Sequence, residues 1–248
     1  MILAINIGNT NMRAALGDEK GIVAQTVFYS HEGLMQIETN MGASIWDKIE
    51  GCIIATVVPS QTEIVLGMLQ EKRKLVKRVD IRNCGKLKTE RYTGLLGEDR
   101  VVCCASALQK YSPPFVVIDY GTATTINLVD ANCEFLGGVI LCGLRTGLNA
   151  LTKNTAQLPS IDDLKTVPLI GTNTAENLIS GAVIGLACAT EGIIARMETE
   201  MGIKENGGIL PAIVTGGHAP TILPHCHFEH KHEPSLLLEG LLSLWKDI

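Results

Sequence analysis

Three short glycine-containing segments, each directly after an apolar run, hold the residues best suited to bind phosphate. They are residues 8–10 (Gly-Asn-Thr), residues 121–124 (Gly-Thr-Ala-Thr) and the glycine pair at 216–217. A glycine lets backbone N–H groups approach a phosphate oxygen closely, and neighbouring hydroxyls and amides add hydrogen bonds. One such turn is also typical of an ordinary hairpin. Three turns in this order indicate a nucleotide site.

The first two turns belong to a longer internal repeat. Residues 2–18 and 115–130 each contain an apolar run, a polar residue, a glycine, small polar residues and a second apolar run. At an offset of 113, Asn6 corresponds to Asp119 and Gly8 to Gly121. This pattern predicts a buried strand, a tight turn and an antiparallel partner strand. The segments that follow are also alike, so we expect an α/β protein of two lobes, residues 1–112 and 113–248, each with a mixed five-stranded sheet.

Hydrophobic periodicity places the remaining elements, and the lack of proline in residues 172–197 further favours a helix there. Further strands are expected at residues 21–28, 52–57, 75–80, 134–141 and 209–215. Helices are expected at residues 31–49, 61–71, 98–110, 144–152, 172–197 and 235–246.

The composition narrows the class of protein. The chain has 248 residues, of which 46% are apolar and 4% aromatic, so aliphatic side chains fill a sizeable core. Its net charge of −5 provides no basic face of the kind that nucleic-acid binding needs. The first residues lack a basic leader region, and no apolar run approaches the roughly 18 residues of a membrane span. We therefore expect a cytoplasmic protein with neither nucleic-acid nor membrane partners.

Cysteine and histidine usage leaves a metal site as the weaker alternative. None of the eight cysteines is in a Cys-x-x-Cys pair, which favours buried free thiols in a reducing compartment. Residues 225–232 hold four of the six histidines and one cysteine, and an exposed extended segment of this kind could bind a transition metal. A polar surface loop is the preferred interpretation.

Residues 92–100 (Tyr-Thr-Gly-Leu-Leu-Gly-Glu-Asp-Arg) narrow the class further, because their end resembles the Gly-x-Asp-Arg signature of type III pantothenate kinases. Other segments resemble motifs of the same family in order along almost the whole chain. They are residues 6–13 (its Asp-x-Gly-Asn-Thr phosphate motif), 54–59 (its Ser-Val-Val-Pro segment), 119–125 (its second phosphate and cation motif), 137–144 (its Gly-Gly-x-Ile-x-Pro-Gly-Leu motif) and 173–181 (its helix with a substrate-binding threonine).

The resemblance implies duplicated actin-like (ribonuclease H-like) lobes with an ATP cleft between them. It also implies ATP-dependent phosphorylation of pantothenate to 4'-phosphopantothenate, the first step of coenzyme A biosynthesis, in a homodimer with active sites at its interface. Asp99 would be the general base, and Asp119 would hold a monovalent cation, K⁺ or NH₄⁺, while Mg²⁺ would arrive with ATP. Pantothenate would be bound by Tyr92, Gly97, Glu98, Asp99, Arg100 and Thr174. ATP would be bound by Asn6, Ile7, Gly8, Asn9, Thr10, Asn11, Met12, Arg13 and Thr122.

The sequence departs from the family pattern at a few positions. Asn6 stands where the family has an aspartate, and losing one preorganised charge in such a site could lower the rate by roughly 10²–10³. Asn127 stands where an aspartate is common, Cys142 replaces the usual proline, and the loop after Tyr92 lacks a proline. Two alternatives therefore stay open: a catalytically weakened homologue with a ligand-binding or regulatory role, and a related enzyme acting on another hydroxylated acid or a sugar.

Overall fold

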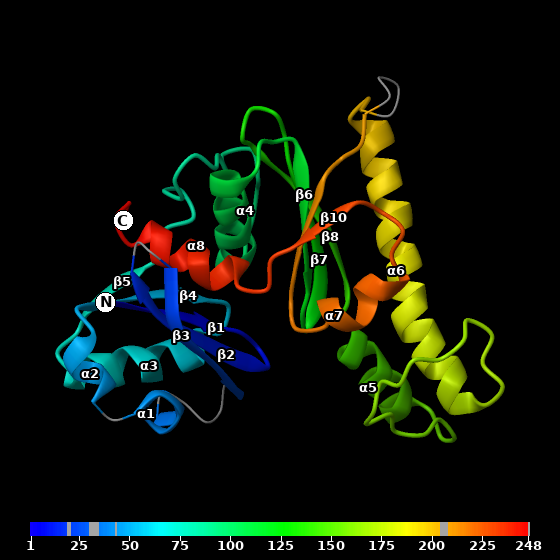
Figure 1. Ribbon diagram of the computed structural model, residues 1–248, viewed down its shortest axis with the longest axis horizontal. Helices are drawn as coiled ribbons and strands as arrows, with labels where there is room; N and C mark the ends of the chain where they lie inside the picture. Colours follow the sequence, from blue (N-terminus) through cyan, green and yellow to red (C-terminus); the bar gives the residue numbers. More distant parts are fainter. Residues whose placement is uncertain (19–20, 30–34, 43, 204–207, 248) are drawn as a thin grey trace. The chain divides into compact units, whose positions relative to one another are not determined.

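The computed structural model shown in Figure 1 describes residues 1–18, 21–29, 35–42, 44–203 and 208–247. They divide into two compact units, each of which is described by itself. Unit 1 comprises Met1–Pro113, Asp130–Leu136 and Ser235–Ile248, and unit 2 comprises Pro114–Val129 and Gly137–Pro234. Unit 1 thus includes a short internal segment and the C-terminal segment, which are remote from it in sequence.

The sheet of unit 1 has the strand order β3-β2-β1-β4-β5. The first three strands in the chain form an antiparallel meander, and the other two run parallel to the first. This is the mixed sheet that the repeat predicted. The strands are β1 (Ile2–Ile7), β2 (Asn11–Asp18), β3 (Gly21–Tyr29), β4 (Gly51–Thr56) and β5 (Leu75–Arg78).

One face of this sheet packs on three helices, α1 (Met35–Met41), α2 (Ile45–Lys48) and α3 (Pro59–Glu71), and Figure 1 shows them on the same side of the sheet. Leu3, Ile5 and Ile54 are fully buried in that core. The single helix predicted over residues 31–49 is wrong, because Gly42 adopts a φ of +88° after α1, in the left-handed region that ends helices. Residues 31–34 and 43 of that prediction lie outside the described residues.

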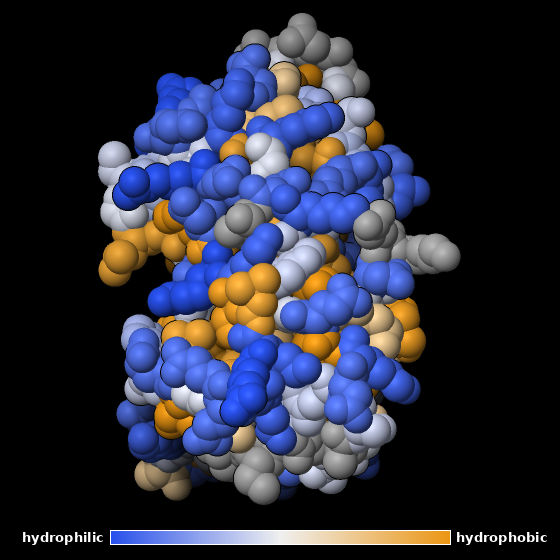
Figure 2. Space-filling model, turned by 90° about the vertical axis from the view of Figure 1, so that its left-hand side faces the viewer, coloured by the Kyte–Doolittle hydropathy of each residue, from blue (hydrophilic) through white to orange (hydrophobic). Residues whose placement is uncertain are grey.

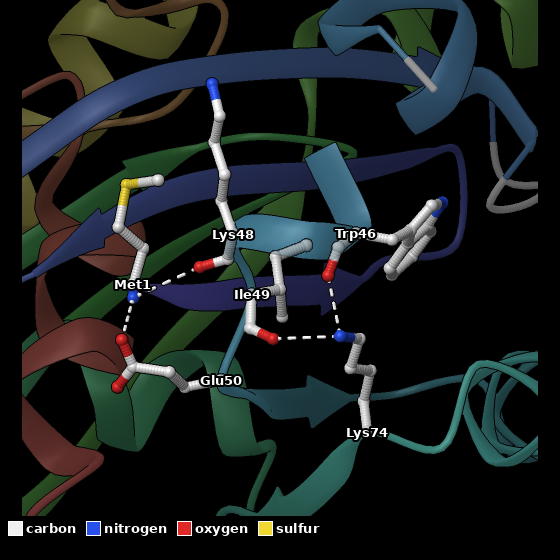
Figure 3. Close-up of polar contacts among 6 residues, drawn as sticks. All are labelled: Met1, Trp46, Lys48, Ile49, Glu50 and Lys74. Atoms are coloured by element: carbon white, nitrogen blue, oxygen red, sulfur yellow. Dashed lines mark hydrogen bonds and ion pairs between the residues drawn. The ribbon is translucent and has the colours of Figure 1, made fainter. Parts of the chain in front are cut away.

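The end of α2 is held by two cations (Figure 3). Lys74 Nζ donates to the carbonyls of Trp46 at 2.6 Å and Ile49 at 3.0 Å. The amino group of Met1 lies 3.3 Å from the carbonyl of Lys48 and 2.6 Å from Glu50 Oε1. The last carbonyls of a helix have no intrahelical partner and favour positive charge. These contacts therefore fix the chain where it enters β4, next to the start of β1.

The opposite face of the same sheet is covered by α4 (Glu98–Lys110) and α8 (Leu236–Leu244). Small residues on that face allow the close approach. A Cβ at Gly51 would overlap the indole ring of Trp245, and a Cβ at Gly17 would lie 2.6 Å from Leu242 Cδ1. The C-terminal helix is therefore part of the core of unit 1.

The sheet of unit 2 has the order β10-β9-β6-β7-β8, which repeats the strand order of unit 1 and confirms the predicted duplication of the fold. Its strands are β6 (Phe115–Tyr120), β7 (Ala123–Val129), β8 (Phe135–Cys142), β9 (Ala212–Thr215) and β10 (His230–His232). Its helical segments are α5 (Leu144–Asn154), α6 (Thr174–Glu200), α7 (Ala219–Ile222) and the 3₁₀ turn η3 (Leu223–His225).

Residues 230–232 correct one prediction. They form the edge strand β10, parallel to β9, whereas a polar loop was expected over the whole of residues 225–232. Its alternating His-Lys-His sequence suits a sheet edge, where charged and polar side chains prevent pairing with other chains. Among the described residues, no group of three or more His, Cys, Asp or Glu side chains could hold a metal ion, so the metal alternative gains no support.

The cysteines only partly follow the expectation of burial. All eight are free thiols, and Cys52, Cys84, Cys103 and Cys104 are buried. Cys133 and Cys226 are half-buried, while Cys142 and Cys188 are exposed, so the prediction is wrong for the last two.

Helix α6 is long and apolar enough to cross a membrane by length and composition, a property that the sequence analysis did not anticipate. Only 39% of its most apolar window is buried within the chain. Core helices of soluble proteins share this composition, so the finding by itself does not show that α6 crosses a membrane.

On the face of the molecule shown in Figure 2, hydrophilic side chains surround smaller apolar areas, as is usual for an exposed protein surface.

The contact between Gly51 and Trp245 predicts opposite effects for two glycine substitutions. Gly51→Ala should lower the free energy of unfolding by about 1–3 kcal/mol, because the added methyl group overpacks the core beneath α8. Gly67→Ala should raise it by about 0.5–1 kcal/mol, because Gly67 lies inside α3 and a Cβ there has no neighbour within 4 Å. Urea denaturation measures both variants, and equal effects would contradict the packing described.

Candidate active site

The turn between β1 and β2 depends on a glycine. The N–H of Gly8 donates to the carbonyl of Asn11 at 3.1 Å. A Cβ at Gly8 would lie 2.9 Å from that carbonyl oxygen and 3.8 Å from Asn6 Nδ2. Asn9 and Thr10 form the exposed tip of the turn. The tip therefore exposes backbone and small polar groups.

Side chains alternate between the two faces of the sheet along β1 and β2, and this divides the residues predicted to bind ATP into two groups. Ile7 and Met12 are fully buried in the core that faces α1–α3, so only their backbone can meet a ligand. Asn6 pairs with Arg13 across the strands, and paired residues project from the same face of a sheet. Asn6 is 8% exposed, and its Oδ1 has no hydrogen-bond partner within the described chain. A buried acceptor without a partner is a feature of ligand sites.

The start of α4 is attached to the end of β4. Glu98 Oε2 accepts a hydrogen bond of 2.7 Å from the backbone N–H of Thr56. Arg78 lies 3.6 Å from the other carboxylate oxygen of Glu98. Burial raises the pKa of Glu98, while the Thr56 N–H and the charge of Arg78 act against this. The structure thus shows Glu98 tying α4 to the sheet, and it gives no direct sign of the substrate contact that was predicted for this residue.

Asp99 follows at the first turn of α4, close to Gly97. Its Oδ1 accepts from the N–H of Arg100 at 2.8 Å, and a Cβ at Gly97 would come within 2.6 Å of the same oxygen. Burial raises the pKa of Asp99, and the Arg100 N–H and guanidinium partly oppose that shift. A raised pKa makes a carboxylate a better proton acceptor, as general-base catalysis requires.

Two aromatic rings hold the side chain of Arg100. Its guanidinium carbon lies 5.7 Å from the centroid of the Tyr92 ring and 5.3 Å from that of the Phe135 ring. The two rings meet edge to face, with centroids 5.4 Å apart. Such cation–π contacts fix the direction of a planar guanidinium. Sequence reasoning missed Phe135, because nothing near it in the chain signals that the β7–β8 connection reaches this site.

The structure therefore brings together five of the six residues predicted to bind pantothenate, all in unit 1. They are Tyr92, Gly97, Glu98, Asp99 and Arg100. The sixth, Thr174, is an exposed residue in unit 2, at the start of α6, where the side chain of Asn173 caps the helix by accepting from the Glu176 N–H at 3.0 Å.

In unit 2, Asp119 lies at the end of β6 between two glycine turns. The N–H of Gly121 donates to the carbonyl of Ala123 at 3.1 Å. Gly216, after β9, has a φ of +101°, and a Cβ there would overlap Asp119 Oδ1. The second and third glycine turns of the sequence thus meet at one carboxylate. Thr122 is exposed in the first of them, and its carbonyl accepts from Thr146 Oγ1 at 2.7 Å.

The surroundings of Asp119 fit a cation that prefers oxygen ligands. Asp119 pairs with Thr125 on β7 and with Thr215 on β9, so the three side chains form one row across the sheet. Thr215 is 1% exposed, and no hydrogen-bond partner for its Oγ1 exists among the residues described. Hydroxyl and carboxylate oxygens are ligands that hard cations prefer. Asn127 Nδ2 donates to Thr125 Oγ1 at 3.1 Å, a bond that the aspartate common at that position could not donate.

Comparison with solved structures defines the class. MreB5 of Spiroplasma citri bound to ADP has a TM-score of 0.53 at 10% identity, with 99% of this chain and 96% of that chain covered. The ethanolamine utilization protein EutJ from Carboxydothermus hydrogenoformans has a TM-score of 0.57 at 14% identity, with coverage of 97% and 88%. The repeated sheet and these likenesses define a fold of duplicated actin-like lobes.

Sequence comparison identifies the family within that class. A family model for type III pantothenate kinase matches residues 2–196. Proteins named type III pantothenate kinase from Streptomyces coelicolor, Desulfosudis oleivorans and Thermus thermophilus are 31%, 34% and 32% identical to this chain. The matches cover 99%, 97% and 98% of this chain and 98%, 97% and 98% of those relatives. The chain belongs to the type III pantothenate kinase family, and it is therefore a kinase.

The burial of Asp99 predicts how stability depends on pH. Because the pKa of Asp99 is raised on folding, the folded protein binds this proton more tightly than the unfolded chain does. The ionised carboxylate thus destabilises the fold increasingly as the pH rises through the raised pKa. Compared with wild type, Asp99→Asn should gain free energy of unfolding between about pH 3 and pH 7. Urea titrations across that range measure the gain, and a gain only at low pH would contradict the shift.

Proposed function

We infer that this protein phosphorylates the primary hydroxyl of pantothenate with ATP, giving 4'-phosphopantothenate and ADP. The observation that carries the proposal is the half-buried carboxylate of Asp99 at the start of α4, beside an arginine that aromatic rings hold in place. Family membership supports the choice of substrate. The reaction is the opening step of coenzyme A biosynthesis.

In the proposed reaction, Asp99 accepts the hydroxyl proton while the hydroxyl oxygen attacks the γ-phosphorus. The bond from that phosphorus to the bridging oxygen of ADP breaks in the same step. Arg100 is a suitable partner for the carboxylate of pantothenate, because its guanidinium can form two parallel hydrogen bonds. Phosphoryl transfer depends mainly on positioning and charge neutralisation, so a base, a phosphate-binding turn and cations are sufficient in kind. No phospho-enzyme is needed.

Two cations complete the proposal. Mg²⁺ bound to ATP would neutralise phosphate charge, and Asn6 and the Gly8 turn are the groups of unit 1 placed to meet that complex. Asp119, with Thr125 and Thr215 beside it, would hold K⁺ or NH₄⁺. Thr122, next to that carboxylate in the Gly121 turn, would contact ATP.

We also propose a homodimer that joins through α6. A groove of about 380 Å³ runs between the end of β8, α5 and α6, and Gly181, Ala182 and Gly185 of α6 help to line it. Large apolar residues are exposed in the same unit: Ile140, Leu151, Leu169 and Ile170. Small residues let a second helix approach closely, and an apolar helix left largely uncovered is typical of a subunit interface. In such a dimer Thr174, one turn before the groove residue Asn177, would reach the pantothenate of a partner.

A cytoplasmic location suits the proposed substrates. The comparisons lend no support to a weakened homologue with a regulatory role, and we do not favour it. We also do not favour an enzyme for another hydroxylated acid or a sugar, because residues 97–100 (Gly-Glu-Asp-Arg) resemble the signature of pantothenate kinases.

An ADP-release assay with pantothenate, ATP, Mg²⁺ and K⁺ tests the kinase. Wild type should turn over, and Asp99→Asn should lose about 10²–10⁴-fold in kcat, the usual contribution of a positioned base. Replacing K⁺ by Na⁺ should lower the rate. Asp18→Asn, an exposed carboxylate on β2 outside the proposed site, is the matched control and should keep wild-type activity. A rate in Asp99→Asn equal to wild type would exclude Asp99 as the base, and a wild type without turnover or pantothenate binding would exclude the substrate.

A charged substitution in α6 tests the dimer. Gly185 is exposed, and a Cβ there would meet no neighbour within 4 Å, so Gly185→Arg should fold normally. It should nevertheless convert the dimer to a monomer, because an arginine would have to be buried without a partner. Gly67→Arg on α3, equally open, is the control and should stay dimeric. Sedimentation velocity measures the mass, and a dimeric Gly185→Arg protein would refute this interface.

A further inference from the structure

The turn between β1 and β2, with the residues on either side of it, carries one formal charge. Residues 6–13 contain a single arginine, Arg13, and neither an acidic residue nor a lysine. Asn6 and Arg13 face each other across the strands, so the guanidinium stands next to a neutral amide. The segment proposed to meet the ATP phosphates is thus a positive site without a negative neighbour of its own.

The charge of Arg13 is not neutralised elsewhere in the structure. The residue is half-buried, and within the described residues its guanidinium makes no ion pair and no hydrogen bond. The next residues along its sheet row offer no counter-charge, because Val27 lies beyond it on β3 and Ala55 lies beyond Asn6 on β4. A cation in such a position attracts anions, and guanidinium binds phosphate oxygens well.

The two carboxylates that begin α4 already have partners. Glu98 accepts from the Thr56 N–H and pairs with Arg78, and Asp99 accepts from the Arg100 N–H. Unit 1 therefore offers no carboxylate on this hairpin to fix the water shell of a magnesium ion. An aspartate at position 6 would do so, but it would also pair with Arg13 and repel the phosphates.

From this charge balance we propose that the chain binds metal-free ATP about as tightly as it binds the Mg²⁺ complex, because Arg13 supplies charge that Mg²⁺ would otherwise supply. The inference rests on the proposed ATP site. It concerns binding alone, since the proposed transfer step still uses Mg²⁺. Asn6 is in this sense a specificity-determining residue, because its neutral side chain lets the site accept either charge state of the nucleotide.

Calorimetric titration of the full-length protein with ATP, in EDTA and in excess Mg²⁺, tests the proposal. The two dissociation constants of wild type should agree within about threefold. Arg13→Gln should weaken binding of metal-free ATP roughly tenfold and that of the Mg²⁺ complex less, because the unscreened tetra-anion loses more Coulomb energy. Asn6→Asp should weaken metal-free ATP by about the same factor and create a preference for the Mg²⁺ complex.

Matched variants separate this effect from general charge and from misfolding. Arg82→Gln and Asn40→Asp change the charge at exposed positions of unit 1 away from the hairpin, and they should leave both affinities unchanged. Arg13→Lys keeps the charge and should retain most of the metal-free binding. Circular dichroism checks that each variant is folded.

Three outcomes would overturn the inference: a wild type that prefers Mg²⁺–ATP by more than about tenfold, equal losses of both forms in Arg13→Gln, or no binding of metal-free ATP. The kinase proposal fails separately. If pantothenate is phosphorylated but metal-free ATP does not bind, the kinase proposal stands and the inference about Arg13 is wrong. If metal-free ATP binds but pantothenate is not phosphorylated, the inference stands and the kinase proposal is wrong.

Discussion

The hydrogen bond from the backbone N–H of Thr56 to the carboxylate of Glu98, 2.7 Å long, joins the first turn of α4 to the end of β4, the strand next to the central strand β1. Everything that follows on α4 takes its position from this junction. Gly97, directly before it, leaves room for the carboxylate of Asp99, and Asp99 and Arg100 come directly after it. A helix attached to a sheet at its first turn cannot slide along its axis, so the proposed base stays at the edge where β1 and β4 end.

The same edge explains why the remaining packing matters to the site. Both β1 and β4 are buried on both faces, by α1–α3 on one side and by α4 and α8 on the other. Small residues such as Gly17 and Gly51 let α8 lie close to the sheet. The row of Asn6 and Arg13 comes at the end of this covered face, where small buried residues give way to polar groups. The apolar residues of these strands thus pack in the core and make the sheet rigid. The polar groups lie at the strand ends, where ligands bind in open α/β sheets.

The two units share one strand order but differ in the charge of the residues at their strand ends. In unit 1 the equivalent of the strand-end carboxylate is the neutral Asn6, beside a cation. In unit 2 it is Asp119, with the hydroxyls of Thr125 and Thr215 in the same row. The strand-end row of unit 1 is therefore positively charged, and that of unit 2 is negatively charged. The duplication that supplied the fold has diverged in charge at corresponding positions.

The sequence by itself determined the fold class, the duplication, most strands and helices and the contiguous segment around Asp99, since these depend on local periodicity, glycine turns and a contiguous motif. It could not reveal Phe135 against Arg100, the recruitment of residues 235–248 into the core of unit 1, or the break of the helix at Gly42. Nor could it show that the carboxylate of Glu98 accepts a hydrogen bond from the backbone N–H of Thr56, that His230–His232 forms an edge strand or that two cysteines are exposed. Most of these depend on contacts between residues far apart in the chain, whereas the break at Gly42 depends on a positive φ that glycine can adopt but does not have to adopt. Local sequence fixes how a segment folds, but only tertiary packing decides which distant side chain reaches it.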